Sequence, residues 1–402
     1  MILLLDLDDT LISNHIDTFL SAYLKALGQH MAGYAKPETL IKELLTATQW
    51  MVNNTRLDQT LEEVFDAHFY PALGQTKTNL RTGLDEFYAQ VYPSLKPIIS
   101  PRPDAIRMVE TALEHGHRLV IATNPLFPKT AIQQRMIWGN LSPKQYAFEL
   151  ITSYETLHFA KPNPAYYAEI MAQLGWPNEP VMMVGDDLEN DIKPAAQAGL
   201  ATYWITDQGQ SGSSQTSPTT LAGSLDDLID WLNQNLTESV STDFSTPEAV
   251  KLNLTATPAA LFSMTNPLSP DDWTLQPTPG EWSLTEVLCH LRDVENEVNL
   301  PRLEKFKVED NPFFPGIVTD PWAVERQYSL QDGSGALCEF AAARKQTLVD
   351  LNQLPAIDWD RETRHAIFGP TPLRELISFI ATHDRSHLQQ AYQLTKPGHT
   401  NL

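Results

Sequence analysis

Cysteine is nearly absent from this sequence, and positively charged residues are few. The only two cysteines among 402 residues are Cys289 and Cys338. They are able to pair, but so few cysteines in a long chain are more typical of a reduced, intracellular protein. Lys and Arg number 28 against 50 Asp and Glu, which gives a formal net charge of -22. A surface of this sign repels the phosphate backbone, so no nucleic acid is expected as a partner.

Long hydrophobic runs are missing as well. The apolar stretch at the N-terminus ends at Leu5, and no apolar run approaches the ~20 residues of a transmembrane helix. Hydrophobic residues nevertheless make up 42% of the chain, which is enough for packed cores. A length of 402 residues predicts roughly two or three domains. We therefore expect a soluble cytoplasmic protein with no membrane partner.

The first ten residues, MILLLDLDDT, join an apolar run to a cluster of acids. Ile2 to Leu5 has the length and composition of a buried strand in a parallel sheet. Asp6 and Asp8 follow two residues apart, so both are expected on the same side of the chain. Adjacent carboxylates persist most easily beside a cation, with one placed to attack and the other to move a proton. The alternative is a plain turn in which Asp9 caps a helix.

The pattern after this strand predicts two domains. Apolar residues from about 14 to 97 repeat at helical spacing, which indicates a helical insertion, and strands and helices then alternate up to Ile205. We predict a doubly wound α/β fold with an inserted helical cap over residues 1–240. Residues 208–220 are expected to form a flexible loop, and the polar stretch 233–246 marks the boundary. The expected strands are Ile2–Leu5, Arg118–Ala122, Glu149–Thr152, Val181–Val184 and Thr202–Ile205.

Strand signals end at this boundary, and amphipathic segments replace them. Proline-rich connections separate several of these segments, as in an all-α four-helix bundle, which we predict for residues 241–402. The four expected helices are Pro247–Ser263, Ser283–Lys307, Leu337–Leu351 and Pro372–Leu394.

Polar side chains follow the strands of the first domain and a nearby loop, and parallel strands bring their carboxyl ends to one crevice. Carboxylates at this position are suited to bind magnesium. The Thr123 hydroxyl and neighbouring backbone amides can donate hydrogen bonds to phosphate oxygens, and Lys161 can place a positive charge near a transferring group. Phosphoryl transfer needs this combination. Singly, Lys161 reads as a surface lysine, and Asp187 and Asp191 read equally well as helix caps. The candidate residues are Asp6, Asp8, Thr123, Asn124, Lys161, Asp186, Asp187 and Asp191.

In this order, the motifs DLDDT, IATN, FAKPNP and VGDDLEND resemble those of the haloacid dehalogenase-like (HAD) hydrolase superfamily, over about residues 1–236. The resemblance implies that Asp6 becomes a phosphoaspartate. It implies that Asp8 acts as acid and base and lends its carbonyl oxygen to Mg²⁺. Asp186 then binds Mg²⁺ with help from Asp187 or Asp191.

An acid two residues after the nucleophile separates phosphatases from dehalogenases in this superfamily. Asp8 therefore favours hydrolysis of a small phosphorylated metabolite. The substrate is expected to contact the cap, near Trp50, Met51, Phe65 or Phe69, although helical spacing does not say which of these line the pocket.

Histidines extend the apolar face of the last predicted helix. His383 and His387 are four residues apart and face the bundle interior, and His290 lies on the apolar face of the second helix. Together they predict an open three-histidine site for a divalent transition metal, zinc, nickel or iron. The alternative is that these are ordinary core histidines. Cys289 points about 100° away from His290 around the helix and is expected to pack rather than bind metal.

The stretches PGEWSLTEVLCHLRDVE and THDRSHLQQ resemble the DinB/YfiT-like four-helix bundle family, over about residues 247–395. The resemblance implies a divalent metal on His290, His383 and His387. It leaves two functions open for the bundle. One is a separate transferase that uses the metal and a low-molecular-weight thiol, and the other is a non-catalytic docking or homodimerising module.

Overall fold

The computed structural model describes residues 1–206, 220–234 and 240–396. Internal contacts group Met1–Tyr166 with Glu179–Asp243, and Tyr167–Asn178 with Phe244–Leu402. The division predicted at residue 240 remains a prediction, because this grouping also assigns an internal segment to the second unit. The predicted loop at 208–220 lies almost wholly outside the described residues.

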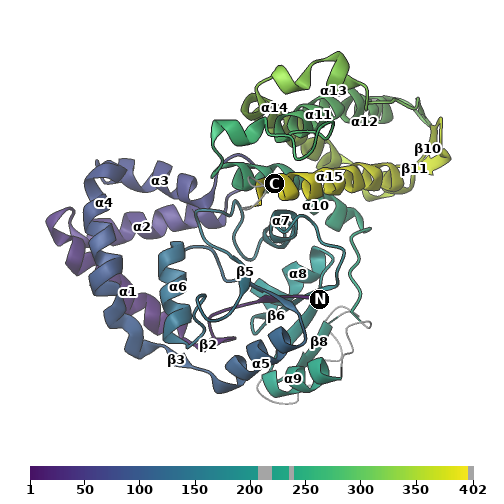
Figure 1. The fold of residues 1–402 in the computed structure, drawn as a ribbon. Coiled ribbons are helices and arrows are strands. Elements are labelled where there is room, and N and C mark those ends of the chain that lie inside the picture. The colour runs from purple at the N-terminus through teal and green to yellow at the C-terminus, as the bar shows by residue number, and fades with distance from the viewer. Residues whose placement is uncertain (207–219, 235–239, 397–402) are drawn as a thin grey trace. The chain divides into compact units, whose positions relative to one another are not determined.

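A six-stranded parallel sheet forms the centre of the first unit (Figure 1), and its strand order is β5-β4-β1-β6-β7-β8. This arrangement confirms the predicted doubly wound α/β class. The short strand β8 was not predicted, because Thr220 stands at the end of a Gly-, Ser- and Thr-rich stretch. The strands are β1 (Ile2–Leu5), β4 (Arg118–Ile121), β5 (Phe148–Ile151), β6 (Val181–Gly185), β7 (Ala201–Ile205) and β8 (Thr220–Gly223).

The register of the sheet brings the predicted polar residues to one edge. All four residues of β1 are buried, because this strand is covered on both faces and paired on both sides. Leu5 pairs with Ile121 of β4 and with Val184 of β6. The residues that follow these three positions therefore leave the sheet side by side.

Helices connect these strands, and their number and order agree with the sequence pattern. That pattern predicts helices at Lys129–Trp138 and Asp191–Ala198. The helix α6 coincides with the first, and the second begins earlier, as a single π-helical turn. The helices are α5 (Pro103–Glu114), α6 (Lys129–Trp138), α7 (Ala165–Gln173), η4 (Leu188–Ile192), α8 (Lys193–Gln197) and α9 (Leu225–Asn233).

The predicted insertion is helical, as expected. Its ends are joined by a short antiparallel pair, β2 (Ile12–Ser13) with β3 (Ser100–Pro101). A capping box between Thr60 and Glu63 fixes the start of α3. The elements of this cap are α1 (Ile16–His30), η1 (Met31–Gly33), α2 (Pro37–Val52), α3 (Leu61–Ala72), α4 (Lys77–Glu86), η2 (Phe87–Val91) and η3 (Tyr92–Ile98).

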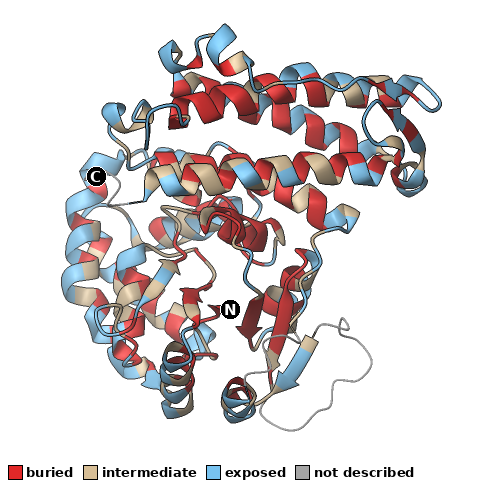
Figure 2. Cartoon of the chain, turned by 45° about the vertical axis from the view of Figure 1, so that its right-hand side comes forward, coloured by how far each residue is buried: buried red, intermediate tan, exposed pale blue. Residues whose placement is uncertain are grey.

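The second unit contains the four predicted long helical segments, with buried residues gathered on their inner faces (Figure 2). A capping box of Ser283 and Glu286 starts the second segment. The segments are α10 (Pro247–Thr265), α11 (Leu284–Val294) continued by η7 (Glu295–Asn299) and α12 (Leu300–Val308), α14 (Gly333–Gln353) and α15 (Leu373–Thr395). None of the described helices in either unit has the length and hydropathy needed to cross a membrane.

A small sheet accompanies the bundle and was not predicted. The strands β9 (Phe313–Phe314), β10 (Glu362–His365) and β11 (Gly369–Pro372) are two to four residues long. Strands this short carry too few residues for an alternating pattern to stand out, and prolines interrupt β11.

Candidate active site and metal site

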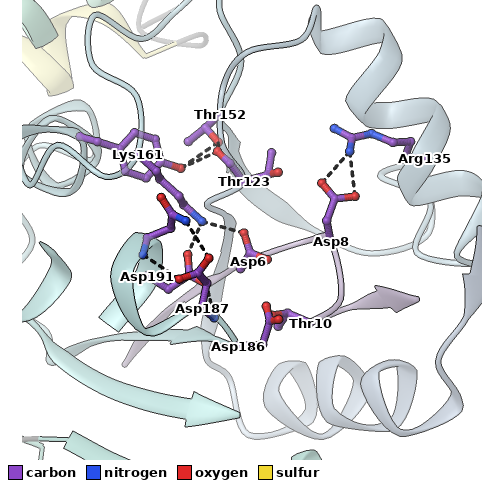
Figure 3. A network of polar contacts seen from close by, with 12 residues as sticks. Asp6, Asp8, Thr10, Thr123, Arg135, Thr152, Lys161, Asp186, Asp187 and Asp191 are labelled. Atoms are coloured by element: carbon purple, nitrogen blue, oxygen red, sulfur yellow. Dashed lines mark hydrogen bonds and ion pairs between the residues drawn. The ribbon is translucent and has the colours of Figure 1, made fainter. Parts of the chain in front are cut away.

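The carboxyl ends of β1 and β6 meet at a buried lysine. Lys161 Nζ donates hydrogen bonds to Asp6 Oδ1 at 2.6 Å and to Asp191 Oδ1 at 2.5 Å (Figure 3). Carboxylate oxygens of Asp6, Asp186 and Asp191 lie within 4.8 Å of one another. Four of the predicted site residues, from three separate parts of the sequence, therefore form one cluster.

Neighbouring groups hold two of these acids in place. The Thr10 hydroxyl donates to Asp186 Oδ1 at 2.9 Å, and the Trp204 indole donates to the backbone oxygen of Asp186 at 2.9 Å. Asp191 packs directly over Gly185, where an added Cβ would lie only 2.3 Å from Asp191 Oδ2. The last residue of β6 must be glycine for Asp191 to approach this closely.

The sequence left two roles open for Asp187 and Asp191, helix capping and a place in the metal site, and the structure assigns one role to each residue. Asp187 is exposed and caps the following helical turn, accepting hydrogen bonds from the backbone amides of Glu189 and Asn190. Asp191 is 1% exposed and bound to Lys161. The geometry thus places Asp191, and not the side chain of Asp187, among the clustered carboxylates.

The cluster carries unbalanced negative charge. Burial raises the pKa of Asp6 well above its usual value, although Lys161 opposes this, and burial also raises the pKa of Asp186. One ammonium among three carboxylates leaves two negative charges when all are ionised. A divalent cation with oxygen ligands compensates this charge, so the donor set fits Mg²⁺.

The carboxylate of Asp8 forms an ion pair with Arg135, a partner that the sequence did not suggest. Arg135 Nη1 lies 2.8 and 2.6 Å from the two oxygens of Asp8, and Asn14 Nδ2 donates to Oδ1 at 2.6 Å. Asp8 and Asp6 line the same cavity, but Asp8 pairs with Arg135, whereas Asp6 shares Lys161 with Asp191. Arg135 falls among apolar residues in α6 and carries no motif, so no signal in a single sequence identifies its partner.

A large cavity adjoins the cluster and extends under the cap. It has a volume of about 880 Å³ and is lined by Thr123, Asn124 and Lys161, the three residues predicted to bind the substrate. The backbone oxygen of Thr123 accepts hydrogen bonds from Thr152 and Tyr166, both at 2.8 Å, which fixes the end of β4. Of the four cap residues singled out from the sequence, Phe65 and Phe69 line the cavity, whereas Trp50 and Met51 lie outside its lining.

The three predicted histidines meet in the second unit. His383 Nε2 lies 3.0 Å from His290 Nε2 and 3.2 Å from His387 Nε2. The Trp282 ring stacks on His387 with a centroid separation of 5.9 Å. Three imidazole nitrogens that converge on one point have the arrangement of a metal site with three protein ligands.

The protonation state of these histidines also favours metal binding. Burial, together with the neighbouring histidines, lowers the pKa of His290 to about 3, and burial lowers those of His383 and His387 to about 4. All three rings are therefore neutral near pH 7. The Gln390 side-chain oxygen lies 3.2 Å from His387 Nδ1. This oxygen can accept a hydrogen bond from a protonated Nδ1, the tautomer in which Nε2 keeps its lone pair for a metal.

The two cysteines lie apart from this cluster and are both free. Cys289 is buried, and its Sγ lies 3.7 Å from the side-chain oxygen of Gln331. Cys338 is exposed. The packing role expected for Cys289 agrees with these contacts.

Comparison with known proteins finds two families and several relatives. Residues 1–199 match the haloacid dehalogenase-like hydrolases, and residues 253–391 match the DinB superfamily. The pyrimidine 5'-nucleotidase PynA of Streptococcus pneumoniae is 31% identical over 136 residues, which are 33% of this chain and 55% of that protein. The pyrimidine 5'-nucleotidase YjjG of Escherichia coli is 30% identical, over 34% of this chain and 58% of that protein. The uncharacterized protein YuaE of Bacillus subtilis is 26% identical, over 32% of this chain and 85% of that protein.

The chain spans little more than half the length of the two nucleotidases that it matches. The two family matches cover separate parts of the sequence, in the order that the motifs predict. The chain therefore combines a haloacid dehalogenase-like hydrolase region at its N-terminus with a DinB-superfamily region at its C-terminus.

Proposed function

We propose that the first unit is a magnesium-dependent phosphohydrolase that acts on a small phosphorylated metabolite. The observation that carries this proposal is the cluster of Asp6, Asp186 and Asp191 around Lys161, at the carboxyl edge of the sheet and open to a cavity. Mg²⁺ held by Asp6, Asp186, Asp191 and the backbone oxygen of Asp8 would shield the charge of the phosphate.

The residues of this site divide the reaction into two transfers. Asp6 Oδ attacks phosphorus, the bond to the leaving oxygen breaks, and Asp8 gives that oxygen a proton. Water then attacks the phosphoaspartate and passes a proton to Asp8, and the bond between phosphorus and Asp6 breaks to release inorganic phosphate. Lys161 neutralises charge on the transferring group, and Thr123 and Asn124 donate hydrogen bonds to its oxygens.

The relatives suggest which substrates to test first. PynA and YjjG are named as pyrimidine 5'-nucleotidases, and the cavity of about 880 Å³ has room for a nucleoside as the leaving group. Pyrimidine nucleoside monophosphates therefore head a panel of phosphorylated metabolites.

Hydrolysis of p-nitrophenyl phosphate with Mg²⁺ tests the proposal. We expect activity in the wild-type chain and its loss in Asp6→Asn, which cannot form the intermediate. Asp226→Asn is the matched control, since Asp226 is exposed and pairs with Arg107. Unchanged turnover by a folded Asp6→Asn variant would refute the proposed function.

For the second unit we propose a divalent transition metal, zinc, nickel or iron, bound by His290, His383 and His387. The Nε2 atoms of His290 and His387, at 3.0 and 3.2 Å from that of His383, favour this site. Analysis of transition metals in the full chain should show one bound ion that is lost in His383→Ala and kept in His365→Ala. His365 is a buried histidine of β10 outside the cluster. Equal metal content in both variants would exclude this site.

The same metal serves either of two roles, a transferase reaction with a low-molecular-weight thiol or a docking or homodimerising module. Chelation separates them. Loss of a thiol-linked reaction supports the first role, and a change confined to melting temperature or oligomer size supports the second. The cytoplasmic location remains a prediction.

A further inference from the structure

The acid–base residue Asp8 is held by a residue with no assigned role. One side-chain nitrogen of Arg135 contacts both carboxylate oxygens of Asp8, at 2.8 and 2.6 Å. Figure 3 shows Asp8 turned toward Arg135, while Asp6 turns toward Lys161. The side chain of Arg135 is 1% exposed, whereas that of Asp8 keeps 21% exposure. The carboxylate therefore remains accessible, whereas the group that orients it is buried in the wall of the cavity.

Arg135 is itself fixed in place. Its guanidinium carbon lies 5.7 Å from the centre of the Phe19 ring and 5.0 Å from that of Phe127. Phe19 comes from the cap helix α1, and Phe127 follows β4. Among the described residues, Nε of Arg135 has no hydrogen-bond partner. Burying Nε without a hydrogen-bond partner is unfavourable, and the two aromatic rings pack against the guanidinium. These contacts restrict the Arg135 side chain to a position beside Asp8.

We infer that Arg135 is a positioning residue for the proposed phosphohydrolase, which orients Asp8 for both proton transfers. This inference rests on the proposed function. Asn14 supplies a second constraint through its 2.6 Å hydrogen bond to Asp8. A purely stabilising role accounts less well for these contacts, since desolvation offsets most of the attraction in a buried ion pair.

Steady-state kinetics of Arg135→Met test this role, with p-nitrophenyl phosphate and saturating Mg²⁺. Displacement of a catalytic group by about 1 Å costs on the order of 100-fold in rate, so we expect kcat to fall about 10- to 100-fold. If Arg135 acts through Asp8 and not on the substrate, KM should stay within about twofold, and Arg135→Lys should recover part of kcat. Arg118→Met is the matched control. Arg118 pairs with Glu149 and Glu179 at the opposite end of the same sheet.

A double-mutant cycle separates positioning from general destabilisation. If Arg135 acts through Asp8, adding Arg135→Met to Asp8→Asn should cause no further loss of kcat. An equal loss in both backgrounds, an unchanged kcat, or a loss confined to KM would overturn the inference. If Arg135→Met does not fold, Asn14→Ala removes the other donor to Asp8 and is judged by the same criteria. An inactive wild-type chain would instead refute the proposed function itself.

Discussion

Replacement of Arg344 by methionine should destabilise the helical bundle strongly. Arg344 is fully buried, and its guanidinium contacts three other helical segments. It donates to Glu295 of η7 at 2.8 and 2.9 Å. It also donates to Asp384 of α15 and to the backbone oxygen of Leu254 in α10, each at 3.1 Å. Glu295 and Asp384 are each about 1% exposed. Methionine fills similar volume but leaves both carboxylates without a counter-ion.

The size of the effect follows from this burial. Removing one partner from a buried ion pair costs about 3–5 kcal/mol, because a charge is left without compensation in a medium of low dielectric constant. A domain is stable by only about 5–15 kcal/mol, so the bundle loses a large share of its free energy of unfolding. Neutralising both acids as well, with Glu295→Gln and Asp384→Asn, should restore much of the loss.

Hydrogen exchange in the full-length protein measures this change where it occurs. The slowest amides of α14 and α15 report the free energy of opening the bundle. Arg374→Met is the control, since Arg374 forms an exposed pair with Asp360 and its loss should change stability by less than about 0.5 kcal/mol. A loss below about 1 kcal/mol in Arg344→Met would refute the reasoning.

Two further predictions concern the metal sites. Gly185→Ala places a Cβ 2.3 Å from Asp191 Oδ2, which displaces this carboxylate from the proposed Mg²⁺ site. The Mg²⁺ concentration for half-maximal phosphatase activity should therefore rise about 10- to 100-fold. Gly33→Ala, where the added Cβ meets nothing beyond its own stretch of chain within 4 Å, should leave this concentration unchanged. Equal behaviour of the two variants would count against the role of Asp191. The second prediction concerns the pH dependence of stability in protein treated with chelator. The pKa values of His290, His383 and His387 are lowered in the folded state, whereas unfolded histidines have pKa values of about 6.5. Below about pH 6.5 the unfolded state therefore binds more protons than the folded state. Stability against urea should therefore be full above about pH 6.5 and fall toward about pH 4, and a midpoint that does not change between pH 7 and pH 5 would contradict this.

Much of the fold and of the candidate site could be predicted from local patterns. Strand β1 is marked by its own apolar run, and the acids after β1 and β6 stand at strand ends that a parallel sheet must bring together. The spacing of His383 and His387 fixes their shared helix face in the same way.

The partners of buried charges could not be predicted, because they are far apart in the sequence. Arg135 lies 127 residues from Asp8, and Arg344 lies 49 residues from Glu295. Each of these residues reads as an ordinary polar position on a helix until the tertiary structure pairs it. The short strands β8 to β11 were missed for a different reason, since they owe their pairing to neighbouring segments rather than to their own pattern.

The most direct test of the central claim is to trap the covalent intermediate on Asp6. An acyl phosphate is reduced by borohydride, so quenching the wild-type enzyme during turnover of p-nitrophenyl phosphate with Mg²⁺ and then reducing it should convert Asp6 to homoserine, detectable by mass spectrometry of its peptide. No such product is expected without substrate. Rapid hydrolysis under conditions in which a phosphoaspartate standard is trapped, with Asp6 left unmodified, would contradict the proposed reaction.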